Sequence, residues 1–229
     1  RDTTCFYVWI DRLSVPQKAS ELQNTLLSRM MATYASARET LVLRSLEKSG
    51  SRYHQRAWTL PEFACSTATR VCTFDREDDV GGAADDQRGA FTQEEELLVG
   101  EVREYYREHV AHIRPLWLLS SGEELESTRN LSNGFKSGWE LYMRVRLRGL
   151  LNCTVRADRV RATYPLFFCA PVEDHTDLCH LAEAVADAME AYAPESSDAR
   201  MARRNLADVV GASVDKPTRK SRMHISAPR

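Results

Sequence analysis

The chain has 229 residues, of which 43% are hydrophobic and 28% are charged, and its formal net charge at pH 7 is −2. This length is enough for one domain with a full hydrophobic core, and the near-neutral charge argues against a nucleic acid or a membrane as the partner. The longest apolar stretch without a charged residue, 162–172, is shorter than the roughly 20 residues that span a bilayer, so the sequence does not indicate a membrane protein.

The first predicted element is a strand near the start of the chain. Residues 6–10 are all aromatic or β-branched, which is typical of a strand that is buried on both faces. Asp11 and Arg12 follow directly, so we expect polar groups at the C-terminal end of this strand. The sequence begins with Arg1 and contains nothing that resembles a secretory leader, and we expect it to start inside a domain.

A helix is predicted next, over residues 20–37. Ser20 and Gln23 have the spacing of a capping box, which marks the start of a helix. Apolar residues then recur at every fourth position from Leu22 to Tyr34. This period predicts an amphipathic helix with one face turned to the core.

Two strands with a helix between them follow. Short apolar runs at 40–44 and 70–74 predict strands, and the segment between them leads into a helix that ends near residue 69. Strands that alternate with helices in this way predict a parallel α/β sheet.

Glu62 is the first candidate for a catalytic residue. It closes the stretch RAWTLPE at 56–62, in which Pro61 suits the first turn of a helix. Ligand clefts of open α/β sheets lie at such junctions of strand and helix. The alternative is that Glu62 only favours the positive end of its helix dipole, while Trp58 anchors that helix to the core.

The middle of the chain contains a loop and a long helix. Residues 75–89 are rich in acids and glycine and predict a solvated loop. A second capping-box pattern opens a helix from residue 92 to about residue 110. His109 and His112 complement the negative end of this helix, and metal ligation is disfavoured because the motif contains no carboxylate or thiol partner.

A short strand at 114–119 and a basic helix at 139–151 are predicted after it. Arg144, Arg146 and Arg148 alternate with apolar residues in the helix. This cluster has two interpretations: it holds a phosphate, or the arginine stems cover the core while their charged heads reach solvent or acidic loops. The absence of interleaved aromatic residues favours the second.

The C-terminal third is predicted to be helical around one buried segment. The apolar run 164–168 indicates a buried connection or a strand, and an alanine-rich helix is expected at 176–192. A short helix through about residue 210 precedes the stretch 216–229, which we predict to be a disordered basic tail.

We therefore expect three regions along the chain. A partial α/β core occupies 1–75, a helical continuation of the same domain occupies 76–193, and a short helix with the basic tail occupies 194–229. Each of the six cysteines lies among apolar or helical residues, and no closely spaced pair is present. Reduced, buried thiols are the better interpretation, which favours the cytoplasm.

Three segments together resemble the heterokaryon incompatibility (HET) domain family: YVWIDRLSVPQ at 7–17, MATYASA at 31–37 and RAWTLPE at 56–62. In that family a W-I-D-x-L-C-I-x-Q block precedes a helix with a Tyr/Ala segment, a strand and an R-x-W-T-x-Q-E block. The departures are Ser14, Pro16 and Pro61, where the family usually has Cys, Asn and Gln. The resemblance covers about residues 5–75, with a faint likeness at 158–168, and the opening motif of the family is absent.

HET domains are similar to Toll/interleukin-1 receptor (TIR) domains, so the resemblance implies a flavodoxin-like parallel sheet flanked by helices, with a mainly helical C-terminal extension. In NAD-cleaving TIR domains a W-C-x-x-E motif supplies the catalytic Glu, and the stretch from Trp58 to Glu62 has that spacing. The likeness therefore strengthens the case for Glu62.

The resemblance implies two functions. The first is a signalling module of self/non-self recognition or programmed cell death that acts by self-association, with an unknown downstream protein partner. The second is NAD glycohydrolysis, in which NAD is a substrate, no cofactor or metal is needed, and Glu62 stabilises the oxocarbenium-like ribose.

Four further residues are candidates for binding NAD in the second function. Asp11 and Arg12 contact ribose or pyrophosphate, Arg56 pairs with phosphate, and Trp58 stacks on a ring. Each also has a plain structural alternative. Asp11 is a turn or cap residue, Arg56 forms a surface ion pair, and Trp58 belongs to the core.

Overall fold

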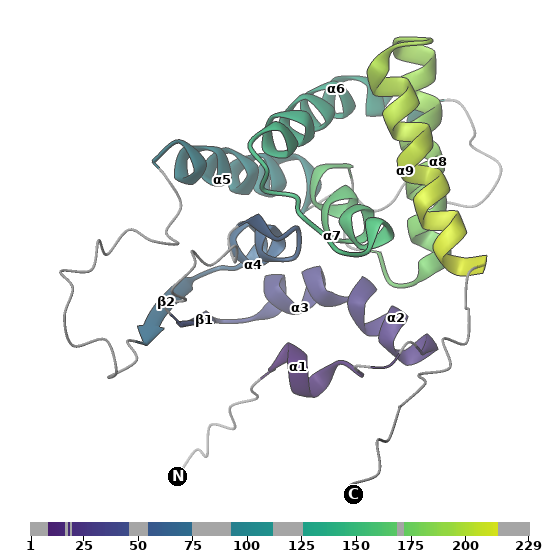
Figure 1. The fold of residues 1–229 in the computed structure, drawn as a ribbon. Helices are drawn as coiled ribbons and strands as arrows, with labels where there is room; N and C mark the ends of the chain where they lie inside the picture. The colour runs from purple at the N-terminus through teal and green to yellow at the C-terminus, as the bar shows by residue number, and fades with distance from the viewer. Residues whose placement is uncertain are drawn as a thin grey trace, which may run out of the picture.

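The structure, a computed structural model, describes residues 9–16, 18, 20–45, 55–74, 93–111, 126–168 and 172–214. Its elements in chain order are α1 (Asp11–Ser14), α2 (Glu21–Ser28), α3 (Met30–Ser36), β1 (Thr40–Ser45), α4 (Thr59–Cys65), β2 (Thr69–Phe74), α5 (Gln93–Tyr105), the π-helix η2 (Tyr106–Val110), α6 (Glu126–Leu147), α7 (Arg156–Phe168), α8 (His175–Tyr192) and α9 (Ser197–Val214) (Figure 1).

The two predicted strands form a parallel pair. β1 and β2 run in register from Thr40 opposite Thr69 to Ser45 opposite Phe74, and α4 lies in the connection between them. The predicted flavodoxin-like sheet, however, is wrong. In the described part of the chain the sheet has only these two strands, and the remaining elements are helices.

The predicted first strand is not found where the structure describes it. Trp9 and Ile10 lie in irregular backbone and are exposed to solvent, so burial on both faces is wrong for these two residues. The chain turns at once into α1, where the amides of Leu13 and Ser14 bond to the Ile10 carbonyl at 2.9 and 2.7 Å. Residues 6–8 of the predicted strand lie outside the described residues.

The helix predicted over 20–37 is two helices. Ser20 caps α2 as expected, since its hydroxyl accepts a hydrogen bond of 3.1 Å from the Gln23 amide. Arg29 interrupts the helix with φ −89° and ψ −3°, a bridge conformation that separates α2 from α3. The capping signal depends on residues that are close in the chain, so the sequence predicts it. No local pattern predicts the single-residue break at Arg29.

The run at 164–168, which was predicted to be a buried connection or a strand, is part of helix α7. Residues 160–168 are all buried, so this half of the helix is surrounded by core. A helix surrounded by core has no amphipathic period, and a short run of it resembles a strand buried on both faces. The predicted helix at 176–192 is confirmed by α8, and α9 extends the helix expected after it.

One hydrophobic cluster runs through the described elements. It joins residues of α3 and α4 to residues of α5 through α9, and α7 is central to it. Trp139, Tyr142 and Phe168 stack within it, with ring centroids 5.2 Å apart for the first pair and 6.1 Å for Trp139 and Phe168. The part of the chain before residue 75 and the helices after it thus share apolar packing.

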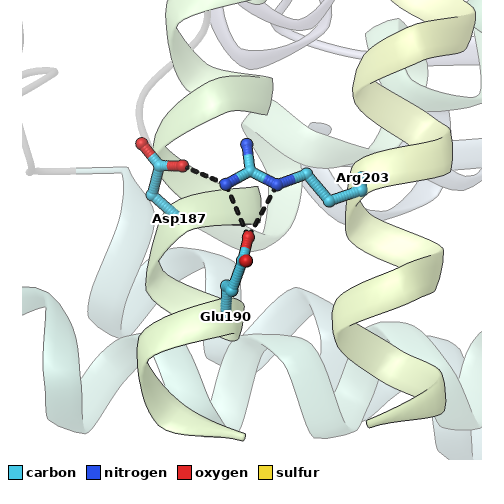
Figure 2. A network of polar contacts seen from close by, with 3 residues as sticks. All are labelled: Asp187, Glu190 and Arg203. Carbon is cyan, nitrogen blue, oxygen red and sulfur yellow. Dashed lines mark hydrogen bonds and ion pairs between the residues drawn. The ribbon is translucent and has the colours of Figure 1, made fainter. Parts of the chain in front are cut away.

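Ion pairs connect neighbouring helices on the surface. Arg203 of α9 bonds to Asp187 and Glu190 of α8 at 2.6–2.8 Å, which joins the two long helices side by side (Figure 2). Arg144 bonds to both carboxylate oxygens of Glu101 in α5, at 2.6 and 3.0 Å. The charged head of Arg144 therefore meets an acid, as the second interpretation of the arginine cluster expects, although that acid lies on a helix.

Candidate functional site

Helix α4 begins inside the RAWTLPE stretch. The backbone turns after Arg56, whose carbonyl accepts bonds from the Thr59 amide at 3.1 Å and from the Thr59 hydroxyl at 2.8 Å. Pro61 is the third residue of the helix, where its missing N–H would have no intrahelical partner. The predicted helix start is confirmed, and Glu62 stands in the first turn.

The Glu62 carboxylate faces α3. Its Oε1 atom accepts a hydrogen bond of 3.3 Å from the Tyr34 hydroxyl, and the residue is half-buried. The Glu62 carbonyl accepts a bond from the Ser66 hydroxyl, which also bonds to the Thr40 hydroxyl at 2.6 Å. Glu62 is therefore fixed between α3 and the start of β1.

The start of α4 is paired with a segment far along the chain. The Ala57 amide donates to the Asn152 carbonyl at 2.9 Å, and the Asn152 amide donates to the Gln55 carbonyl at 2.7 Å. These two bonds form a parallel bridge between Arg56 and Asn152, which lies just before α7. The Arg56 side chain is exposed, so it is available to solvent and to anions.

The end of α4 is capped by α5. Arg103 donates from Nε to the Phe63 carbonyl at 2.9 Å, and its Nη2 atom donates to the same oxygen. The last carbonyls of a helix lack intrahelical partners, and a cation there complements the helix dipole. No local pattern in the sequence pointed to Arg103, because the two residues are 40 positions apart.

Cys65, the last residue of α4, is buried against the π-helix. Burial raises the pKa of its thiol to about 12, and a hydrogen bond with Tyr106 and the charge of Arg103 offset part of this rise. Tyr106 opens η2 and is itself buried. The Cys65 thiol is therefore protonated at neutral pH and shielded from reagents.

The remaining candidate residues are Trp58, Asp11 and Arg12. Trp58 precedes α4 and packs, partly buried, against the core, which is what the anchoring interpretation requires. Asp11 and Arg12 are the first residues of α1, and their side chains lie outside the described part of the structure. A common NAD site that joins Asp11 and Arg12 to Glu62 remains a prediction.

The described residues give no support to metal binding at the candidate site. Among the described residues, no group of three or more His, Cys, Asp or Glu side chains is placed to hold a metal ion. His109 lies beside Glu108, with Nε2 and Oε2 3.7 Å apart, and His112 is outside the described residues. A cavity of about 270 Å³ between the start of α7 and the end of α9 is lined by none of the candidate residues.

The comparisons with known proteins support the motif resemblance. Residues 1–71 match the family model described as Heterokaryon incompatibility protein (HET). This match supports the suspected family for residues 1–71, which we call the HET segment, and the segment contains Asp11, Arg12, Arg56, Trp58 and Glu62. Neither the search of curated proteins nor that of solved structures found a match. Among the described helices, none combines the length and apolarity needed to cross a bilayer.

Proposed function

We propose that this chain is a signalling module of heterokaryon incompatibility, in which recognition of non-self ends in cell death, and that it acts by self-association. The observation that carries the proposal is the family match over residues 1–71. A downstream protein partner follows from a signalling role, and the near-neutral charge of the chain gives no reason to expect nucleic acid.

Exposed apolar side chains in the HET segment support a contact surface. Within the described residues, Trp9, Ile10, Leu13, Leu22 and Leu41 are large, apolar and exposed. Leu13 in α1 is 78% exposed and Leu22 in α2 is 58% exposed. The other exposed residues of this kind are spread along residues 97–210. The proposal is that these side chains contribute to one self-association surface, because contiguous exposed apolar side chains are typical of surfaces that bind proteins.

Induced expression in a eukaryotic host tests this proposal. We expect loss of viability with the wild-type chain, and oligomers in sedimentation velocity of the purified protein. The double change Leu13→Ser and Leu22→Ser should abolish both. The control is Leu147→Ser, because Leu147 is 81% exposed but lies outside the HET segment. A wild-type chain that stays monomeric and harmless at high expression would contradict the proposal.

A second candidate function is NAD glycohydrolysis, favoured by one observation. Glu62 is a half-buried carboxylate beside the Tyr34 hydroxyl, in the first turn of α4. Water would replace nicotinamide at the ribose, giving ADP-ribose and free nicotinamide, while the carboxylate stabilises the positive sugar. The exposed Arg56, six positions earlier, supplies a cation for the pyrophosphate.

Nicotinamide release from NAD distinguishes the two functions. If the chain is an enzyme, Glu62→Gln should abolish release, whereas the exposed Glu21→Gln on α2 should leave it unchanged. Equal background release from wild type and Glu62→Gln would remove the enzymatic candidate and leave signalling. Parallel loss of cell death and of nicotinamide release in Glu62→Gln would join the two functions in one site.

A further inference from the structure

The helix that carries Glu62 is held at both ends by residues beyond the family match. At its start, the backbone of residues 55–57 bonds to Asn152 at 2.7 and 2.9 Å. At its end, Arg103 of α5 donates two bonds to the Phe63 carbonyl. Neither Asn152 nor Arg103 belongs to the matched residues 1–71. The helical region therefore sets the position of a helix from the HET segment.

Helix α4 needs such support because it is short. It has seven residues, and a helix of that length is not stable in water by itself. Two of its C-terminal carbonyls are satisfied by side chains: Glu62 by the Ser66 hydroxyl and Phe63 by Arg103. The bond from Arg103 is charge-assisted and part-buried, and it places a cation at the negative end of the helix.

The contact of Arg103 is also next to the buried thiol. The charge of Arg103 lowers the pKa of Cys65 and Tyr106 shares a hydrogen bond with this thiol, although burial raises its pKa overall. Arg103 and Tyr106 are three positions apart, across the change from α5 to the π-helix η2. This junction therefore contacts α4 through two side chains.

We propose that Arg103 is a positioning residue for Glu62: its guanidinium fixes the C-terminal end of α4, and through α4 it holds the Glu62 carboxylate against Tyr34. This inference rests on the proposed function only for its consequence in cells, since the positioning itself is a property of the purified chain. Release of Arg103 detaches α4 from α5, exposes Cys65, and disorders the surface that carries Glu62.

Thiol labelling of Cys65 tests the positioning directly. A maleimide reagent and peptide mass spectrometry give the labelling rate of each described cysteine in the full chain. Arg103→Met keeps an apolar stem but removes the donors, so Cys65 should be labelled about tenfold faster or more, as expected for a lost hydrogen bond to a charged group. Arg103→Lys retains the charge with fewer donors and should restore part of the protection.

Matched controls separate a local effect from unfolding. Arg107→Met changes an exposed arginine one turn away and should leave Cys65 at the wild-type rate. Cys153 and Cys179 are free, partly buried thiols, and their labelling should not change in Arg103→Met. Equal labelling of Cys65 in wild type and Arg103→Met would overturn the proposal, and so would a parallel rise at Cys179, which indicates global destabilisation.

The cellular assay then separates this proposal from the proposed function. If wild type causes cell death and Glu62→Gln abolishes it, Arg103→Met should lose most of this death and Arg103→Lys should retain part. If wild type causes no death, the proposed function fails while the labelling result still decides the role of Arg103. Full death with Arg103→Met, at equal protein level, would refute the functional consequence of the positioning.

Discussion

The Tyr34 hydroxyl bonds to the Glu62 carboxylate at 3.3 Å, and this contact joins two of the three sequence segments that resemble the HET family. Tyr34 comes from α3 and Glu62 from α4, so β1 lies between them in the chain. The two segments are distant in sequence but meet in the fold. This contact gives a physical reason why both occur in the pattern that resembles the HET family.

Removal of the Tyr34 hydroxyl should weaken the fold and leave its shape intact. Tyr34→Phe deletes the donor to Glu62 while the ring still fills its buried place, so we expect a loss of about 1–2 kcal/mol in the free energy of unfolding. Urea denaturation measures it. Tyr192→Phe is the control, because Tyr192 is exposed and should change stability by less than about 0.5 kcal/mol. Equal stability of Tyr34→Phe and wild type would show that the contact contributes nothing.

Substitution of Asn205 should cost more stability, because its side-chain amide bonds to two buried hydroxyls. Its Nδ2 atom donates to Tyr142 at 3.2 Å and to Tyr164 at 2.8 Å, joining α9 to α6 and α7. Asn205→Ala leaves both tyrosine oxygens without this donor and should cost about 2–3 kcal/mol. The exposed Asn152→Ala, which loses one bond to the Gly149 carbonyl, should cost less than about 1 kcal/mol. A smaller loss for Asn205→Ala than for Asn152→Ala would contradict the importance of this buried network.

Sequence patterns predicted the elements whose signals are local. The sequence predicts both strands of the sheet, the Ser20 cap and the start of α4, because propensity and capping act within a few residues. The number of strands in the sheet could not be predicted in this way, since it depends on how distant segments pack. The run at 164–168 was ambiguous because hydrophobic periodicity does not distinguish a fully buried helix from a fully buried strand in so short a segment.

The candidate site was predictable only in part. Glu62 could be placed in the first turn of a helix, but its partner Tyr34 could not be deduced, since a contact across 28 positions leaves no periodic trace. Arg103 lies within the helix predicted from residue 92 to about residue 110, but no sequence pattern distinguishes it, because its contact with Phe63 spans 40 positions. Side chains that support a site from other elements are fixed by tertiary packing, so one sequence without its fold does not reveal them.

Two glycines in helices predict opposite effects of the same substitution. A Cβ atom at Gly138 would lie 2.5 Å from the Tyr105 hydroxyl and closer still to the Phe167 carbonyl, whereas one at Gly211 would meet nothing within 4 Å. Gly138→Ala should therefore destabilise the protein by about 1–3 kcal/mol through overpacking. Gly211→Ala should stabilise it by about 0.5–1 kcal/mol through helix propensity. Thermal unfolding of both variants measures the effects, and a stabilised Gly138→Ala would show that the helices can separate at no cost.

The ion-pair network between α8 and α9 should contribute little, despite its short distances. Arg203, Asp187 and Glu190 all lie on the surface, with 46%, 60% and 54% of their side chains exposed. Solvent screens such pairs, so Arg203→Ala should cost less than about 1 kcal/mol, and the cost should shrink further at high salt. Urea midpoints at low and high ionic strength test this. A loss that does not depend on salt would indicate that the arginine stem, and not its charge, provides the stabilisation.

His175 should make the fold less stable in mild acid. Burial, and then the positive charge of Arg161, lower the pKa of His175 from its ordinary value of 6.5, while Asp174 acts in the opposite direction. The folded chain therefore binds this proton less readily than the unfolded chain. The contribution of neutral His175 to the free energy of unfolding is complete above about pH 7. It is lost as the pH falls through 6.5 towards the lowered pKa.

His175→Gln isolates this contribution, because glutamine keeps a polar side chain beside Cys179 but does not titrate. The His175 Nε2 atom lies 3.5 Å from the Cys179 sulfur, and its buried Nδ1 atom has no hydrogen-bond partner among the described residues. Protonation would place a second cation next to the buried Arg161, which pairs with Asp158 at 2.6 Å. As the pH is lowered from about 7.5 to about 5, the urea midpoint of wild type should therefore fall further than that of His175→Gln. Parallel curves for the two proteins would show that a different group accounts for the acid sensitivity.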